Sequence, residues 1–392
     1  MSKRSFRTAL AVVVGSLVLI AALAGWFVHR ALQYPDAAHA GTGKGVEVEI
    51  KSGMSFPAVA AQLSAQGVIA KPTWFRMYAM WEGKTTQVKP GKYVLKDNET
   101  PRAILKKLTE GVKEVAITVK IPEGKSMLEV FDLIEKACPP KPEPGRPCPS
   151  IAKAADLAAL ARDKTFLATY AITGDSVEGY LFPDTYQFRV DEKPATVLAR
   201  MIGRHQAVWN ELVTKHPKDL AKLKELTGWG ERDILTMASI VEKEAIEDDE
   251  RKKIARVFIN RLTSKSFSPR KLQTDPTIRY GCMVPLQKSA ACIAWNEPCL
   301  KAVPPKPMGC DRLHRAQLDD LDNPYNTYAH EGLPPGPISN PGRASIEATL
   351  APDDNDYFYF VAQAKGSRRH AFAHSREEHE RNVKKYVGSD DE

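Results

Sequence analysis

Signatures of several common enzyme classes are absent from this sequence of 392 residues. It has no GxSxG, HExxH, P-loop or Rossmann glycine pattern, which argues against α/β-hydrolases, zinc peptidases and the usual nucleotide-binding folds. The nine histidines lack metal-ligand spacing and no CxxC pair occurs, so we expect no metal and no other cofactor. Dense lysine and arginine runs and nucleic-acid-binding motifs are also missing, and we expect no nucleic-acid partner.

What is present is an ordinary globular composition, with 43% hydrophobic and 27% charged residues. The length is enough for about two or three domains. The formal net charge of +8 suits an anionic partner, such as a membrane surface or a cell-wall polymer.

A long apolar run opens the chain. It extends over residues 8–28 without a charge, and three basic residues precede it. About 20 apolar residues suffice to cross a bilayer, and leading cations favour a cytoplasmic N-terminus. We therefore expect residues 1–34 to form a cytoplasmic stub and a single-pass anchor, with the rest exported. The alternative is a signal peptide cleaved after Ala40, but the run exceeds the usual apolar segment of about 7–15 residues.

The six cysteines agree with export, because disulfides form in oxidising compartments. Cys138 and Cys148 bracket a proline-rich loop, and we expect them to pair with each other. The other four lie in one short segment, at Cys282, Cys292, Cys299 and Cys310. Three pairings are possible among those four.

The exported part is predicted to be α+β and to contain two units. Residues 45–112 form a small module, in which alternating apolar residues indicate strands and spaced ones indicate helices. We expect strands at 45–51 and 91–95 and helices at 55–66, 72–81 and 101–108. Such a module is near the lower size limit for independent folding.

Residues 113–388 are predicted to form a larger mixed domain. Its expected elements are a strand at 115–119, helices at 126–136, 151–163, 194–216, 220–226, 231–245 and 251–262, a strand at 357–361 and a helix at 375–387. Residues 263–345 are rich in glycine, proline and asparagine and show few periodic runs. Long loops of this kind are often functional.

The helix expected at 231–245 carries two glutamates beside an apolar stripe. Glu242 lies on one flank of the stripe and Glu244 on the opposite flank. A carboxylate beside an apolar surface loses hydration, which favours its protonated form, as a general acid for glycosidic cleavage requires. The alternative is that both are surface charges paired with lysines and arginines, and the helical pattern does not decide between these readings.

Several stretches together resemble the YceG-like endolytic murein transglycosylases. They follow the family's order and lie within residues 115–387: EGYLFPDTY (178–186), ASIVEKEA (238–245), VFINRL (257–262), LQTDPT (272–277), YNTY (325–328) and GLPPGPISNPG (332–342). Residues 45–112 look like the family's LysM-like module, which implies glycan-strand binding.

The resemblance implies a lytic transglycosylase in a bacterial inner membrane with a periplasmic catalytic domain. It assigns catalysis to Glu242, which would protonate the oxygen between N-acetylmuramic acid and N-acetylglucosamine. The same carboxylate would then take the proton of the muramoyl C6 hydroxyl, leaving a 1,6-anhydromuramic end. Candidates for lining the cleft are Gln273, Asp275, Asn326, Thr327 and Tyr328. The implied partners are peptidoglycan glycan strands and peptidoglycan synthases.

Two readings compete with this one: a non-catalytic wall-binding scaffold and an ordinary glycan hydrolase. The sequence also departs from the family pattern at two places. Residues 282–312, with four cysteines, are expected to be a disulfide-stapled insertion near the cleft that alters substrate access. His379-Glu380 stands where a His-Asn pair is usual, which weakens the case for a role of that site.

Overall fold

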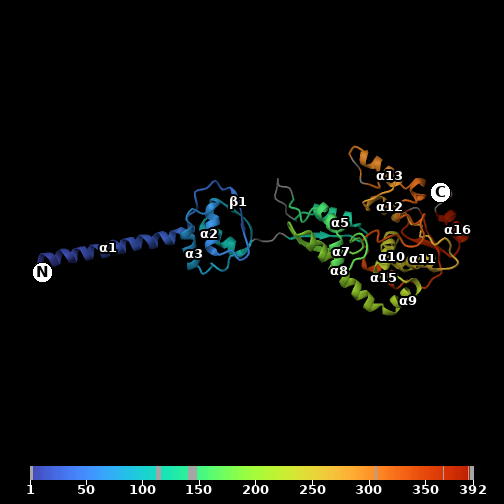
Figure 1. The fold of residues 1–392 in the computed structure, drawn as a ribbon, viewed down its shortest axis with the longest axis horizontal. Helices are drawn as coiled ribbons and strands as arrows, with labels where there is room; N and C mark the ends of the chain where they lie inside the picture. Colours follow the sequence, from blue (N-terminus) through green and yellow to red (C-terminus); the bar gives the residue numbers. More distant parts are fainter. Residues whose placement is uncertain are drawn as a thin grey trace. The chain divides into compact units, whose positions relative to one another are not determined.

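The computed structural model describes residues 3–111, 116–139, 148–304, 306, 308–364, 366–386 and 388. The chain divides into two compact units, Met1–Glu114 and Val115–Glu392, each with its own hydrophobic core. Figure 1 shows helices throughout, with short strands in both units. The expected mixed α+β class is confirmed, and its sheets are all two-stranded within the described residues.

The first unit begins with α1 (Lys3–Gln33), which a short 3-10 turn, η1 (Tyr34–Asp36), extends. Figure 1 shows α1 as one long helix leading away from the rest of this unit. The stretch Val13–Asp36 is long and apolar enough to cross a membrane, a test that a signal sequence also passes.

The module after α1 contains β1 (Gly45–Ile50), α2 (Phe56–Ala65), α3 (Pro72–Trp81), β2 (Gly91–Lys96) and α4 (Pro101–Glu110). The strands pair antiparallel, from Gly45 opposite Lys96 to Ile50 opposite Gly91. Their alternation buries Val48, Ile50, Tyr93 and Leu95 against the helices, as period-two patterning requires. All five predicted elements are present, with ends that differ by a few residues.

The second unit opens with β3 (Ala116–Lys120), which pairs antiparallel with β4 (Thr185–Arg189). Between them lie α5 (Met127–Lys136), α6 (Ala154–Leu160) and α7 (Lys164–Thr169). The helix predicted at 151–163 is present as the shorter α6, and α7 follows it unpredicted; Asp163 caps α7 by accepting a hydrogen bond from the Phe166 amide. The proline-rich loop predicted at 138–149 lies largely outside the described residues.

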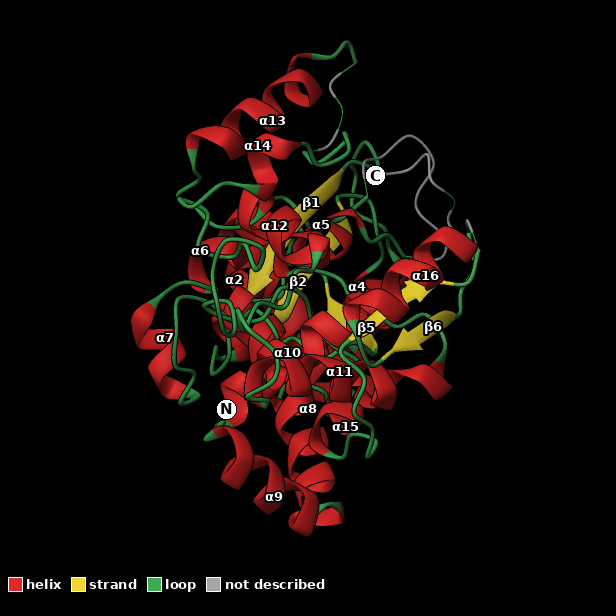
Figure 2. Ribbon diagram, turned by 90° about the vertical axis from the view of Figure 1, so that its right-hand side faces the viewer, coloured by secondary structure: helices red, strands yellow, loops and turns green. Residues whose placement is uncertain are grey.

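A helical layer forms the centre of this unit. It contains α8 (Pro194–Lys215), α9 (Pro217–Thr227), α10 (Glu231–Glu244), η2 (Asp248–Glu250), α11 (Arg251–Thr263) and α15 (Arg343–Leu350). Gly228, at φ 74°, ends α9 in the left-handed conformation and frees the chain to start α10. Every residue from Ile234 to Val241 is buried, and α10 packs against α11 and α15 (Figure 2).

The segment 263–345 is more helical than its composition suggested. It contains α12 (Asp275–Met283), α13 (Ala290–Lys301) and α14 (Arg315–Leu318). These helices are short or carry proline, so no apolar stripe marks them in the sequence. The chain ends with a hairpin of β5 (Tyr359–Ala362) and β6 (His370–Ala373) beside α16 (Arg376–Tyr386), as Figure 2 shows.

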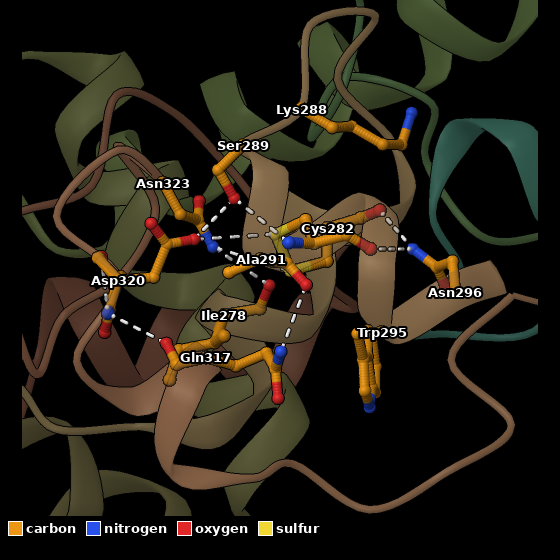
Figure 3. The surroundings of a disulfide bond; sticks show 12 residues. Ile278, Cys282, Lys288, Ser289, Ala291, Trp295, Asn296, Gln317, Asp320 and Asn323 are labelled. Carbon is orange, nitrogen blue, oxygen red and sulfur yellow. Dashed lines mark hydrogen bonds between the residues drawn. A yellow bond between two sulfur atoms is a disulfide. The ribbon is translucent and has the colours of Figure 1, made fainter. Parts of the chain in front are cut away.

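The three disulfides each join neighbouring cysteines. Cys138 pairs with Cys148, which confirms the prediction. In the four-cysteine segment the pairs are Cys282–Cys292 and Cys299–Cys310. Figure 3 shows the surroundings of the bond at Cys282, where Asn296 on α13 donates to the Cys282 carbonyl at 2.9 Å. Ile278, Cys282, Cys292 and Trp295 form a separate small core that fixes α13 to α12.

Candidate active site

A cavity of about 1140 Å³ lies at the C-terminal end of α10. Its walls come from α10, α11, the segment 266–276, Tyr328, β5 and α16. The residues that the following paragraphs use are Glu244, Arg261, Gln273, Asp275, Tyr328, Tyr359 and His379. The cavity therefore joins segments that are more than 100 positions apart in the chain.

Glu244 is the last residue of α10 and lines this cavity. Burial raises the pKa of its carboxyl group to about 7, and the negative charge of Asp275 adds to the effect. The positive charge of Arg261 acts in the opposite direction. A carboxyl group with such a pKa is partly protonated at neutral pH, which is the state that a general acid needs.

Arg261, on α11, is a buried cation beside Glu244. Its Nε donates to the Phe358 carbonyl at 2.6 Å and its Nη1 donates to the Leu272 carbonyl. The guanidinium also lies over the Tyr359 ring, at 5.5 Å from its centroid. Burial lowers the pKa of Arg261 to about 10, so the group stays charged at neutral pH. It fixes the strand-side wall of the cavity and supplies a positive charge there.

Three of the five predicted cleft residues line the cavity, namely Gln273, Asp275 and Tyr328. The Tyr328 hydroxyl donates to Asp275 Oδ1 at 2.9 Å, which holds the phenol and the carboxylate together. Gln273 has a φ of 56°, in the left-handed region that glutamine rarely adopts. Its backbone nitrogen donates to the Thr327 backbone carbonyl at 3.1 Å, so the neighbouring loop holds the strained turn in place.

The other two predicted cleft residues lie inside the loops. Asn326 is fully buried, and its Nδ2 donates to the carbonyls of Gln317, Leu318 and Asp320. Thr327 Oγ1 accepts from the Thr274 amide at 3.1 Å. These side chains hold the loops that form the cavity walls together, and neither lines the cavity. Asparagine and threonine side chains can bind a ligand or fasten a loop, so residue type alone does not separate the two roles.

Glu242 occupies a different environment. Its Oε2 accepts from the Gly342 amide at 3.1 Å and from the Ser345 hydroxyl at 2.7 Å. Gly342 is the N-cap of α15 and Ser345 lies in its first turn, so the carboxylate sits at the helix start, where it accepts from an otherwise unpaired backbone N–H. Arg251 Nη1 lies 3.5 Å from the same oxygen, and the side chain is only 7% exposed. Glu242 does not line the cavity, and its assignment as the catalytic residue stays a prediction.

Glu123 is a further carboxylate near Glu242. Burial raises the pKa of Glu123, and the charge of Glu242 raises it further. A side chain at Gly342 would collide with Glu123, since a Cβ there would lie 1.9 Å from Oε1. The Glu123 side chain is exposed and flexible and can swing aside, so the contact places its carboxylate beside the start of α15 without requiring glycine there.

The stretches 178–186 and 332–342 are tied together in the interior. Glu178 is buried and accepts from the Met127 amide at 3.0 Å and from Asn340 Nδ2 at 2.9 Å. Asn340 Oδ1 in turn accepts from the amides of Gly179 and Leu181. Burial raises the pKa of Glu178 to about 8. Two motifs that carried the family resemblance therefore share one polar network.

Two further residues of the cavity, Arg261 and His379, were not predicted as site residues from the sequence. His379 lines the cavity and stacks on Tyr359 at a ring separation of 5.1 Å. Burial lowers the pKa of His379, and the charge of Arg261 adds to this. A charge within the mostly apolar stretch 257–262 was a usable signal for Arg261. His379 lies on an exposed-looking charged helix, and nothing local marked it.

Known proteins similar to this chain point to one family. The YceG-like family matches residues 48–385. A relative from Bacillus subtilis (strain 168), named endolytic murein transglycosylase, is 31% identical over 361 residues, covering 88% of this chain and 86% of that protein. A relative of the same name from Streptococcus pneumoniae serotype 2 (strain D39 / NCTC 7466) is 28% identical, covering 89% of this chain and 60% of that protein.

A crystal structure of a yceG-like protein from Listeria monocytogenes is also similar, with a TM-score of 0.50 and 30% identity. It covers 87% of this chain and 99% of that one. The mixed fold, the glutamate-lined cavity and these relatives define an enzyme of the lyase class, a transglycosylase. The chain belongs to the YceG-like family.

Proposed function

We propose that the chain cleaves the bond between N-acetylmuramic acid and N-acetylglucosamine within peptidoglycan strands, leaving a 1,6-anhydromuramic end. The observation that carries the proposal is Glu244, a carboxyl group with a raised pKa at the wall of a cavity that also holds amide, phenol and carboxylate groups. Sugars need such a mixture of fixed donors and acceptors beside aromatic rings. The names of the relatives supply the substrate class.

We assign the general acid to Glu244. The family resemblance assigns it to Glu242, which remains the alternative. Support for Glu244 comes from its place in the cavity and from its neighbours, three of which were predicted from the sequence to line the cleft. Against Glu242 stands the engagement of its Oε2 with the first turn of α15.

In the proposed reaction, protonated Glu244 gives its proton to the bridging oxygen, and the N-acetylglucosamine part leaves with a new C4 hydroxyl. The muramoyl ring is left with oxocarbenium character at C1. The Glu244 carboxylate then takes the proton of the C6 hydroxyl as O6 bonds to C1. One carboxyl group suffices because the nucleophile belongs to the substrate. Asp275, held by Tyr328, adds negative charge that favours the cationic transition state.

Product analysis on purified sacculi tests this proposal. The full chain should release muropeptides with anhydro ends, which mass spectrometry separates from hydrolytic ends by one water. Glu244→Gln should lose these products while Glu242→Gln, if folded, keeps them. Loss in Glu242→Gln alone would return the assignment to Glu242. Binding to sacculi without any soluble product from the wild type would favour the scaffold reading.

We also propose that α1 is a retained inner-membrane anchor with a cytoplasmic N-terminus, and that residues 45–112 form a LysM-like module that binds glycan strands. The apolar length of α1 supports the first point and the family resemblance supports the second. Residues 282–312 are proposed to influence substrate access, because α12 begins at the cavity wall with Asp275 and carries Cys282 about 10 Å further along. Peptidoglycan synthases are the proposed protein partners.

A further inference from the structure

The third helix of the small module, α3, exposes an apolar face. Trp81 is 68% exposed, Met80 66% and Met77 37%, whereas Phe75, Tyr78 and Ala79 on the other side are buried in the core. A surface helix normally turns polar side chains to water. In the same module α4 does so, with Arg102, Lys106 and Lys107 exposed. The outward face of α3 therefore has no counterpart on α4.

These side chains share one side of the helix. At about 100° per residue, Trp74, Met77 and Trp81 fall within an arc of about 60°, and Met80 lies about 60° beyond Met77. Arg76 borders the apolar arc and is exposed. Large apolar side chains gathered in this way on a soluble surface mark a place of association.

The apolar arc begins where α1 ends. The Trp74 ring lies 5.1 Å from that of Phe27 on α1 and 5.9 Å from that of Tyr34. The Tyr34 hydroxyl donates to the Lys71 carbonyl at 3.2 Å, just before α3. Arg102 Nε and Nη2 also bind the Asp36 carboxylate, at 2.7 and 3.0 Å. The module is thus fastened to the end of the apolar helix by rings, a hydrogen bond and an ion pair.

The length of α1 then locates α3 relative to a bilayer. The uncharged run ends at Val28, and Tyr34 follows six residues later, or about 9 Å along a helix. The polar layer on each side of the hydrocarbon core is about 5–8 Å thick. Trp74 contacts Phe27, which lies before the end of the uncharged run, and Tyr34, which lies after it. Trp74 therefore falls in or beside the polar layer of the bilayer. Tryptophan and tyrosine concentrate there, and neighbouring basic side chains can reach lipid phosphates.

We propose that the α3 face, defined as Trp74, Met77, Met80 and Trp81, docks on the lipid surface of the leaflet from which α1 emerges. The inference rests on α1 being a retained membrane anchor, as proposed above. Trp81 and the two methionines insert among the headgroups, and Arg76 and Lys71 lie beside the phosphates. The module is held against the membrane, so its distance from the bilayer is fixed.

Site-directed spin labelling of the full chain in phospholipid vesicles tests the proposal. The six native cysteines are paired, so a thiol-reactive nitroxide will attach to a cysteine introduced as Met80→Cys. We expect the Met80 label to be several-fold more accessible to oxygen, which enters lipid, than to a water-soluble nickel chelate. The matched control is Val94→Cys, a residue 63% exposed on β2, whose label should favour the nickel chelate.

A third label, at Leu19→Cys within α1, tests the membrane anchor separately from the docking of the α3 face. If the Leu19 label favours oxygen while the Met80 label favours the nickel chelate, as the Val94 label does, then α1 is an anchor but the α3 face does not dock on lipid. If the Leu19 label itself favours the nickel chelate, both the membrane anchor and the docking of α3 are wrong. The proposed cleavage reaction is tested separately, by the formation of anhydro products. A Met80 label that stays in water with vesicles but becomes immobile on adding glycan strands would overturn the lipid proposal in favour of a glycan-binding face.

Discussion

Glu242 and Glu244 are two residues apart on α10, yet their carboxyl groups enter different environments. Glu242 Oε2 accepts hydrogen bonds from Gly342 and Ser345 at the start of α15, at 3.1 and 2.7 Å. Glu244 lines a cavity of about 1140 Å³. Two positions correspond to about 200° around a helix, so the two side chains leave from nearly opposite sides. Glu242 joins α10 to the start of α15, while Glu244 faces the cavity.

Replacing Glu244 should therefore mainly lower activity, and replacing Glu242 should mainly lower stability. Glu244→Gln should lower the rate of anhydro-product formation by about 100-fold or more, because general-acid catalysis is lost, with little change in melting temperature. Glu242→Gln should lower the unfolding free energy by about 1 kcal/mol, because the amide keeps an acceptor but loses the charge that faces Arg251 and the start of α15. Thermal melts and product assays on both variants check this. An unchanged melting temperature with full loss of activity in Glu242→Gln would contradict it.

The rate should depend on pH through Glu244. Its pKa is raised to about 7, so the protonated acid disappears and the rate falls as the pH rises through about 7. Asp275 contributes to that rise in pKa, so Asp275→Asn should move the falling limb of kcat/KM to lower pH, by up to about one unit. Asp311→Asn removes an exposed carboxylate outside the cavity and should leave the limb in place. A limb that does not move in Asp275→Asn would exclude this coupling.

Glu178 should make the second unit less stable at high pH. Its pKa of about 8 in the folded protein exceeds the ordinary value of 4.5, so folding favours the protonated form. This contribution is complete below about pH 4.5 and is lost as the pH rises through 8. In Glu178→Gln, which cannot ionise, the decline in unfolding free energy over this range should flatten. Urea unfolding at several pH values measures it, and parallel curves for both proteins would refute the assignment.

The Gln273 side chain should lower the stability of the fold and contribute to glycan cleavage. Its φ of 56° costs an L side chain about 1–2 kcal/mol, whereas glycine loses only about 0.5–1 kcal/mol in entropy. Gln273→Gly should therefore unfold at an equal or slightly higher temperature while glycan cleavage falls, since the amide leaves the cavity wall. Gln273→Val is the control and should be destabilised. A fully active Gln273→Gly would remove the side chain from substrate binding.

The two disulfides of residues 282–312 should differ in effect. Cys282–Cys292 belongs to a buried cluster on α12, whose first residue, Asp275, lines the cavity. Replacing both cysteines by alanine should cost about 2–4 kcal/mol and lower activity. The Cys299–Cys310 pair has an exposed end, so its removal should leave glycan cleavage unchanged. Melting temperatures and product assays distinguish the two cases, and equal losses of activity would contradict the expected difference.

Much of the local structure could be predicted from the sequence. The five elements of residues 45–112 follow from short-range alternation and spacing, because each buries one face against its near neighbours. The Cys138–Cys148 pairing followed from proximity along the chain. The helices in 263–345 could not be predicted, since α12 and α13 pack on each other around a disulfide and need no long apolar stripe.

The sequence by itself determined that α10 is a helix with a glutamate on each flank of its apolar stripe, and that residues 272–277 and 325–328 carry motifs that resemble the YceG-like family. Only the tertiary structure decided that Glu244 lines the cavity with Gln273, Asp275 and Tyr328, while Asn326 and Thr327 face inward. Helical periodicity gives the direction of a side chain around its own axis. It does not say whether α15, which starts about 100 residues later, or an open cavity lies in that direction.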